Sequence, residues 1–91
     1  MWYVYFLELA GSDVYVGSTN DLKRRVASHR AGQVKSTRAH MPMALKSYVA
    51  VDTELAARAL ERYFKSGSGK AFAYKRFLGG RVAPPAMGTS G

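Results

Sequence analysis

The chain has 91 residues, no cysteine, and 14 lysines and arginines against six aspartates and glutamates, so its net charge is +8. This length allows one domain with a modest core, and the absence of cysteine excludes a disulfide framework and a thiolate zinc site. No apolar run approaches the roughly 20 residues that span a bilayer, and the N-terminus lacks the basic start of a signal peptide, so we expect a soluble cytoplasmic protein. The positive charge favours a polyanionic partner, most commonly nucleic acid.

The N-terminal residues are typical of a β-hairpin. The segments are a strand over 2–9 (WYVYFLEL), a turn over 10–13 (AGSD) and a second strand over 14–17 (VYVG). Aromatic and β-branched residues favour strands, and a four-residue connection favours antiparallel pairing. Because side chains alternate along a strand, Tyr3, Tyr5 and Leu7 share one face, and Tyr15 shares a face with Gly17.

The pattern then changes to the helical period at GSTND, and predicts a helix over about 21–31. One of Thr19, Asn20 or Asp21 is the expected N-cap, with Asn20 or Thr19 preferred, because short polar side chains accept hydrogen bonds from the first turn. The apolar stripe of this helix comprises Leu22, Val26 and His29. Arg25 lies at the edge of the stripe, one turn before His29.

The remaining segments complete an α+β arrangement. They are a loop over 30–44, a strand over 45–51, a helix over 54–66 capped by Asp52 or Thr53, a break at GSG (67–69) and a basic helix over 70–78. The order ββα–β–αα predicts a small three-stranded antiparallel sheet flanked by helices. We expect a single domain over 1–78, followed by a flexible Gly/Pro-rich tail over 79–91.

The residues that carry chemistry exclude several mechanisms. Two histidines and six scattered carboxylates do not form the acidic cluster of a two-metal site, and GSTND has too few glycines for a phosphate-binding loop. Ser18, His29 and Asp21 lack the nucleophile elbow that would frame a triad. If a metal takes part, the pattern favours one hydrated Mg²⁺ on a single carboxylate, completed by a substrate phosphate, with Glu61 as the candidate ligand. The alternative is that Glu61 forms a solvated ion pair with Arg58 or Lys65.

Two tripeptides ten residues apart carry a family resemblance. YVY over 3–5 and YVG over 15–17 are followed by Arg25, and by Glu61 in the second long helix. This combination, which extends over about 2–78, resembles the GIY-YIG endonucleases, and in particular a small standalone branch related to the nuclease module of the bacterial excision-repair endonuclease. In this family the first tripeptide begins with glycine, where this chain has Tyr3, and some repair members have lysine where this chain has Ser18.

The resemblance implies a role for each matching residue. Tyr5 and Tyr15 would flank the catalytic centre, Arg25 would bind the scissile phosphate, and His29 would lie near the attacking or leaving oxygen. Glu61 would hold the metal, Mg²⁺ or Mn²⁺. The implied activity is metal-dependent hydrolysis of DNA phosphodiester bonds, and the implied setting is DNA repair.

The identity of the general base stays open at this point. Tyr5 is preferred and Tyr15 is possible, while His29 is a third option. A free tyrosine has a pKa of about 10 and is a poor base at neutral pH. Nearby cations such as Arg25 favour the phenolate, so we expect the basic surroundings to lower the tyrosine pKa.

Basic residues outside the centre are expected to hold the nucleic-acid backbone rather than to recognise bases. They are Arg24, Arg30, Lys35, Arg38, His40 and Lys70, with Lys75 and Arg76 in the last helix. A second hypothesis is a non-catalytic or partner-dependent nucleic-acid-binding module on the same fold, since 91 residues leave no room for a separate recognition domain. A protein–protein adaptor is a third, and it does not account for the Tyr, Arg, His and Glu set. The pattern does not determine the oligomeric state, and we assume a monomer.

Overall fold

The computed structural model describes residues 1–76, and the predicted tail over 79–91 lies outside the described residues. Its elements are β1 (Trp2–Glu8), a 3₁₀ turn (Ala10–Ser12), β2 (Val14–Thr19), α1 (Leu22–Arg30), α2 (Lys35–Arg38), β3 (Ala44–Val51), α3 (Glu54–Lys65) and α4 (Gly67–Arg76). This order confirms the α+β prediction. No helix within the described residues is long and apolar enough to cross a membrane.

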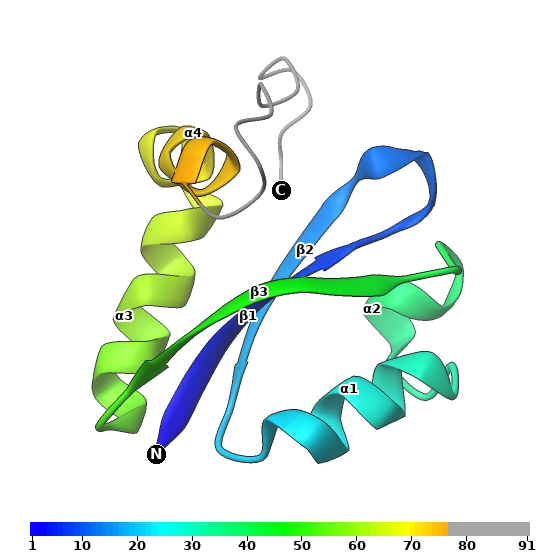
Figure 1. Cartoon of the computed structure of the whole chain (residues 1–91), viewed down its shortest axis with the longest axis horizontal. Helices are drawn as coiled ribbons and strands as arrows, with labels where there is room; N and C mark the ends of the chain where they lie inside the picture. The colour runs from blue at the N-terminus through cyan, green and yellow to red at the C-terminus, as the bar shows by residue number, and fades with distance from the viewer. Residues whose placement is uncertain (77–91) are drawn as a thin grey trace.

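The three strands form an antiparallel sheet in the order β2-β1-β3, with the predicted hairpin at one edge (Figure 1). In the hairpin register Tyr5 pairs with Gly17, and Leu7 pairs with Tyr15. Directly paired residues share a face of the sheet, so both tyrosines lie on the same face. Within the described part of the chain β2 pairs only with β1, which leaves its outer edge available to other elements.

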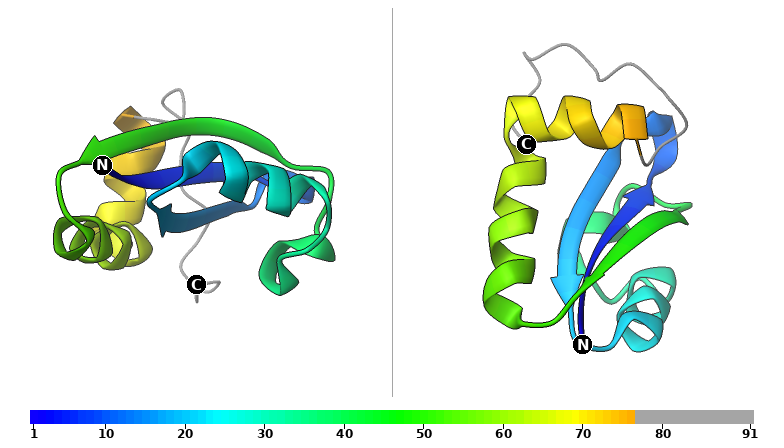
Figure 2. Two further views of the ribbon diagram at one scale, coloured as in Figure 1. Left: turned by 90° about the horizontal axis from the view of Figure 1, so that it is seen from below. Right: turned by 60° about the vertical axis from the view of Figure 1, so that its left-hand side comes forward.

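Each face of the sheet is covered by its own helices (Figures 1 and 2). Val4 and Phe6 of β1 pack with Ala57 and Phe64 of α3, and the core on this face continues to α4. The opposite face carries a second cluster, in which Tyr5, Leu7 and Leu9 are buried and Leu22 of α1 packs against them. Alternate side chains of β1 therefore contribute to two separate cores, one between the sheet and α3 and one between the sheet and α1.

The boundaries of the first helix differ from the prediction. The N-cap is Asp21, whose Oδ1 accepts a hydrogen bond from the backbone N–H of Arg24 at 3.1 Å. Asp21 is one of the three residues expected in this role but not one of the two preferred. Thr19 is still part of β2, and its hydroxyl accepts from the N–H of Asp21 instead. β2 thus extends beyond its expected end at Gly17, and Asp21 is the N-cap of α1.

The predicted loop over 30–44 contains the short helix α2, which was not predicted because this segment shows no clean helical period.

The predicted break at 67–69 is wrong, since α4 begins at Gly67 and only Ser66 has an extended backbone. The Ser66 hydroxyl accepts from the N–H of Gly69 at 3.2 Å. A side chain at Gly69 would collide with the backbone of Tyr63, so this glycine lets α4 pack closely against α3. Thr53 caps α3, one of the two caps expected.

Candidate active site

Four of the five predicted catalytic residues line one hollow of about 350 Å³ at the edge of β2. They are Tyr5, Tyr15, Arg25 and Glu61. The tyrosines and Arg25 come from the α1 face of the sheet, while Glu61 comes from α3 on the opposite face. The hollow therefore wraps around the edge of β2, and this edge is what allows residues from both faces to meet.

Gly17 provides the space for the Tyr5 hydroxyl. A Cβ at position 17 would lie 2.5 Å from the Tyr5 hydroxyl oxygen and 3.0 Å from Cε2 of Tyr15. Both distances are too short for a stable contact, so the absence of a side chain at Gly17 sets how closely the two rings approach. The ring centroids of Tyr5 and Tyr15 are 6.3 Å apart.

The fifth predicted residue, His29, lies beneath the hollow. It has no exposed surface, and its Nε2 is 2.9 Å from the Tyr5 hydroxyl. Its Nδ1 is 2.8 Å from Oγ1 of Thr37, which is also fully buried. Both ring nitrogens of His29 are thus bound to side chains, and the ring reaches the hollow through the Tyr5 hydroxyl and through an edge contact with Tyr15, with ring centroids 5.2 Å apart.

Electrostatics in the hollow differ from expectation at Tyr5. Burial raises the pKa of Tyr5, and the hydrogen-bonding guanidinium of Arg25 offsets only part of that rise. The expectation that basic surroundings lower the tyrosine pKa is therefore wrong for Tyr5, because it leaves only 1% of its surface exposed and desolvation opposes the phenolate. The tyrosine hydroxyls in turn raise the pKa of Arg25, above all the Tyr5 hydroxyl, so the guanidinium stays cationic.

His29 is a neutral imidazole at pH 7. Burial is the main cause that lowers its pKa, and the positive charge of Arg25 adds to the effect. A neutral imidazole carries one N–H and one free lone pair, so it can accept a proton from a neighbouring hydroxyl.

Glu61 is held as a carboxylate in the hollow. Burial alone would raise its pKa, but hydrogen bonds from Ser18 and Lys65 outweigh it and keep the pKa below the ordinary value. Ser18 donates to Oε1 at 2.5 Å, and Lys65 donates to Oε2 at 2.9 Å. Of the two ion pairs considered for Glu61, the structure contains the one with Lys65, whereas Arg58 pairs with Glu54.

Glu61 fits a hydrated divalent cation as its only carboxylate ligand. Among residues 1–76 there is no group of three His, Cys, Asp or Glu side chains that could enclose a metal. Mg²⁺ commonly binds through one carboxylate with water and substrate phosphate filling the other positions, and the half-buried, ionised Glu61 offers this kind of ligand. Lys65 shares the same carboxylate, so it would have to release Oε2 or remain beside the ion.

Two further hollows adjoin the first along β2. One of about 260 Å³ is lined by Arg24 and shares Arg25 with the first hollow. The other, of about 430 Å³, is lined by Lys65, His40 and Lys70 and shares Tyr15. Three of the predicted nucleic-acid-binding residues thus lie beside the candidate active site. Lys35 and Arg38 are exposed on α2, whose Ser36 also lines the larger hollow.

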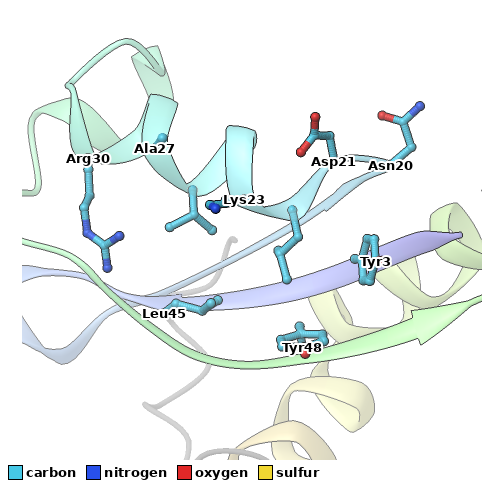
Figure 3. Close-up of a pocket in the computed structure, with 10 residues that line it drawn as sticks. Tyr3, Asn20, Asp21, Lys23, Ala27, Arg30, Leu45 and Tyr48 are labelled. Atoms are coloured by element: carbon cyan, nitrogen blue, oxygen red, sulfur yellow. The ribbon is translucent and has the colours of Figure 1, made fainter.

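Arg30 is placed elsewhere, in a hollow of about 650 Å³ between α1 and β3 (Figure 3). It extends from α1 toward Leu45, and Tyr3 and Tyr48 form the floor with ring centroids 5.9 Å apart. This hollow lies on the other side of α1 from Glu61. Arg30 therefore lies on the opposite side of α1 from Arg24 and Arg25.

Sequence reasoning missed two polar residues of the site. From the sequence, Ser18 is excluded as a triad serine and is otherwise only a departure from the family pattern, yet the Ser18 hydroxyl orients Glu61. Thr37 lay in the segment expected to be a loop, yet it binds His29. Side-chain alternation along β2 would have placed Ser18 on the α3 face if the strand had been extended past Gly17. No local signal in the sequence connects Thr37 with His29.

The fold and the hollow at the edge of β2 define a catalytic domain of a known class. The model of the GIY-YIG catalytic domain matches residues 1–75 of the chain. The chain belongs to the GIY-YIG family, a nuclease family, as the two tripeptides indicated.

Similar proteins lie in a small standalone branch. A UPF0213 protein of Streptococcus pyogenes serotype M5 is 44% identical over 64 residues, which is 69% of this chain and 70% of that protein. A UPF0213 protein of serotype M3 is 42% identical over the same length and the same shares of both chains. The solution NMR structure of UPF0213 protein BH0048 from Bacillus halodurans superposes with a TM-score of 0.53 at 32% identity, covering 88% of this chain and 87% of that one.

Proposed function

We propose that this protein is a metal-dependent endonuclease that hydrolyses DNA phosphodiester bonds in the hollow at the edge of β2. The observation that carries the proposal is the meeting of a permanent cation, two tyrosine hydroxyls and an ionised carboxylate in one hollow. A phosphodiester needs charge neutralisation, a base for water and a place for a divalent ion, and these residue types supply all three.

Arg25 is the proposed phosphate ligand. Its side chain lines the hollow, no carboxylate within the described residues pairs with it, and the two tyrosine hydroxyls, above all that of Tyr5, raise its pKa so that it stays cationic. A guanidinium can contact two phosphate oxygens at once, and it would stabilise the charge that builds on them as water attacks.

Tyr5 is the proposed base, and His29 accepts the proton that Tyr5 gives up. The raised pKa of Tyr5 makes its hydroxyl a neutral phenol before reaction, and the lone pair of the neutral His29 lies 2.9 Å from that hydroxyl. As water attacks phosphorus in line, its proton passes to the Tyr5 oxygen and the phenol proton passes to Nε2. The bond to the 3′ oxygen breaks, leaving a 5′-phosphate, and the departing 3′ oxygen takes a proton from solvent to become a 3′-hydroxyl. Nε2 then returns its proton to solvent through the Tyr5 hydroxyl.

Glu61 would hold Mg²⁺ or Mn²⁺. A divalent ion there would supply positive charge to the departing 3′ oxygen. Ser18 orients the carboxylate and keeps it ionised, and Lys65 supplies a second positive charge beside it.

The adjoining hollows suggest how DNA would lie. Arg24 on one side and Lys65 and Lys70 on the other follow the edge of β2 with Arg25 between them. A strand along this edge would place one phosphate at Arg25 and neighbouring phosphates at the flanking cations.

A non-catalytic nucleic-acid-binding module is the second candidate, and the Lys65–Glu61 ion pair favours it. At 2.9 Å this ion pair already neutralises the one carboxylate of residues 1–76 that lines the hollow. A protein that kept this pair would bind phosphate without recruiting a metal.

The test is incubation of the protein with branched, nicked and single-stranded DNA in Mg²⁺ or Mn²⁺, followed by separation of the products. We expect cleavage by the wild type, and a loss of at least about 100-fold in Arg25→Ala and in Glu61→Gln. Matched controls are Arg62→Ala and Glu54→Gln, exposed residues of α3 outside the hollow. Cleavage that survives both test substitutions would overturn the mechanism, and binding without cleavage on every substrate would support the second candidate.

A further inference from the structure

A chain of buried hydrogen bonds continues from the candidate base into α2. It passes from the Tyr5 hydroxyl to Nε2 of His29 at 2.9 Å, and from Nδ1 of His29 to Oγ1 of Thr37 at 2.8 Å. Oγ1 of Thr37 then reaches the carbonyl of Val34 at a longer 3.5 Å. Tyr5, His29 and Thr37 are each at most 1% exposed, so these contacts are largely shielded from bulk water.

The direction of this chain follows from what each group can donate. A neutral Tyr5 has one O–H to donate, and Nε2 of His29 is the acceptor found for it within residues 1–76. The other close polar group, Arg25, has only donors. Nε2 therefore carries the lone pair, and the single proton of the neutral ring lies on Nδ1.

Thr37 is the acceptor that this tautomer requires. The Nδ1–H of His29 donates to Oγ1, and the Thr37 hydroxyl donates its own proton to the Val34 carbonyl. In the reverse arrangement Thr37 would donate to Nδ1, Nε2–H would point at Tyr5, and the Tyr5 O–H would lose its acceptor. A buried hydroxyl left without a partner costs about 1–3 kcal/mol, which favours the first arrangement.

We propose that Thr37 is a positioning residue that holds His29 in the Nδ1–H tautomer, so that Nε2 is free to take the proton of Tyr5. The inference rests on the proposed nuclease function for its kinetic consequence, but the tautomer is a property of the folded protein alone. After the proton moves, the imidazolium has an N–H on each nitrogen, and Thr37 remains the acceptor for one of them. Oγ1 of Thr37 thus accepts a hydrogen bond from Nδ1–H of His29 both before and after proton transfer.

The location of Thr37 explains why a residue so far from DNA can matter. α2 is a single turn within a connection between α1 and β3, and its three backbone hydrogen bonds to Val34 and Thr37 carbonyls hold it in place. Thr37 N–H donates to Val34 O at 3.1 Å, so the hydroxyl and backbone of one residue turn toward the same carbonyl. This local turn directs Oγ1 inward to His29.

The direct test is ¹⁵N NMR of the histidine ring nitrogens in the wild type, Thr37→Val and Thr37→Ser. We expect Nδ1–H for His29 in the wild type and in Thr37→Ser, and a change to Nε2–H in Thr37→Val, where a methyl replaces the hydroxyl with little change of shape. A wild-type Nε2–H tautomer, or an unchanged tautomer in Thr37→Val, would overturn the inference. Because the wild-type spectrum and Thr37→Ser are informative alone, a failure of Thr37→Val to fold does not remove the test.

Cleavage kinetics provide the second readout. Thr37→Val should lower kcat about 10- to 100-fold with an unchanged KM, as expected for loss of a proton acceptor in general base catalysis, and Thr37→Ser should restore the rate. A loss that appears in KM alone, or one that Thr37→Ser shares, argues for a structural role and against the inference. If the wild type cleaves no DNA while the tautomer responds to Thr37 as expected, then the nuclease proposal fails and the positioning role stands.

Discussion

The Ser18 hydroxyl on β2 donates a hydrogen bond to the Glu61 carboxylate on α3, with the two oxygens 2.5 Å apart. Ser18 lies on the α3 face of the edge strand, whereas its neighbour Gly17 faces the Tyr5 hydroxyl. Two consecutive residues of one strand thus contact opposite halves of the candidate active site. The contact also spans 43 residues of sequence, so it depends on how α3 crosses the sheet.

Replacement of Ser18 by alanine should raise the pKa of Glu61, because the hydrogen bond that helps to keep this pKa low is lost while burial remains. We expect a higher Mg²⁺ requirement for cleavage and a loss of about 1 kcal/mol in the free energy of unfolding. Carboxyl ¹³C titration by NMR measures the pKa. Ser28→Ala is the matched control, since its hydroxyl binds the Arg24 carbonyl of its own helix. An unchanged Glu61 titration in Ser18→Ala would contradict this prediction.

Gly17→Ala should abolish most of the activity. A methyl group would occupy space 2.5 Å from the Tyr5 hydroxyl oxygen, and the buried ring cannot move away without breaking its bond to His29. We expect at least about 100-fold slower cleavage, and destabilisation of about 1–3 kcal/mol by chemical unfolding. Gly67→Ala serves as the control, since a Cβ there meets no atom within 4 Å. Wild-type activity in Gly17→Ala would show that the position of Tyr5 is not critical.

The two tyrosines should differ in their response to loss of the hydroxyl. Tyr5→Phe leaves Nε2 of the buried His29 without its partner, so we expect about 1–3 kcal/mol of destabilisation together with a rate loss of about 100-fold or more. Tyr15→Phe should have a smaller effect on both quantities. Unfolding by denaturant and single-turnover cleavage measure the two effects. A greater rate loss in Tyr15→Phe would make Tyr15 the base.

Thermal stability should decrease as the pH falls below about 6.5, because burial lowers the pKa of His29 in the folded state. The unfolded chain then binds a proton that the folded chain does not, so the stabilisation is complete above the unfolded pKa and declines as the pH falls through the folded pKa. Glu61 has the same sign, but its contribution declines only below its ordinary pKa of 4.5. Calorimetry between pH 7.5 and 5 should show a weaker dependence in His29→Gln than in the wild type. The dependence should remain in His40→Gln, and its disappearance there would contradict this assignment.

Lys70→Ala should weaken DNA binding and reduce the slope of log K against log salt by about one, the change expected when one phosphate contact is lost. Arg30→Ala should have a smaller effect, since Arg30 lies across α1 from the hollows along β2. Fluorescence anisotropy with nicked DNA and the Glu61→Gln background measures binding without cleavage. A larger loss of binding in Arg30→Ala than in Lys70→Ala would indicate that DNA binds at the hollow between α1 and β3 instead.

Much of the fold could be predicted because its signals are local. Alternation over Tyr3, Tyr5 and Leu7 and the change to a helical period after Gly17 depend only on neighbouring residues. The four-residue helix α2 escaped detection because it is too short to show a period. Asp21 was among the expected caps but was not preferred, because Thr19, Asn20 and Asp21 are all good caps and only the end of β2 decides among them.

The sequence by itself determined the family, the strand–helix order and the spacing that sets Arg25 one turn before His29. Only the tertiary structure decided that the site wraps around the edge of β2, that Ser18 holds Glu61, and that Thr37 lies behind His29. The physical reason is that each of these contacts joins side chains whose separation depends on the packing of whole elements. The raised pKa of Tyr5 belongs with them, since the sequence showed the cations around this tyrosine but not the burial that outweighs them.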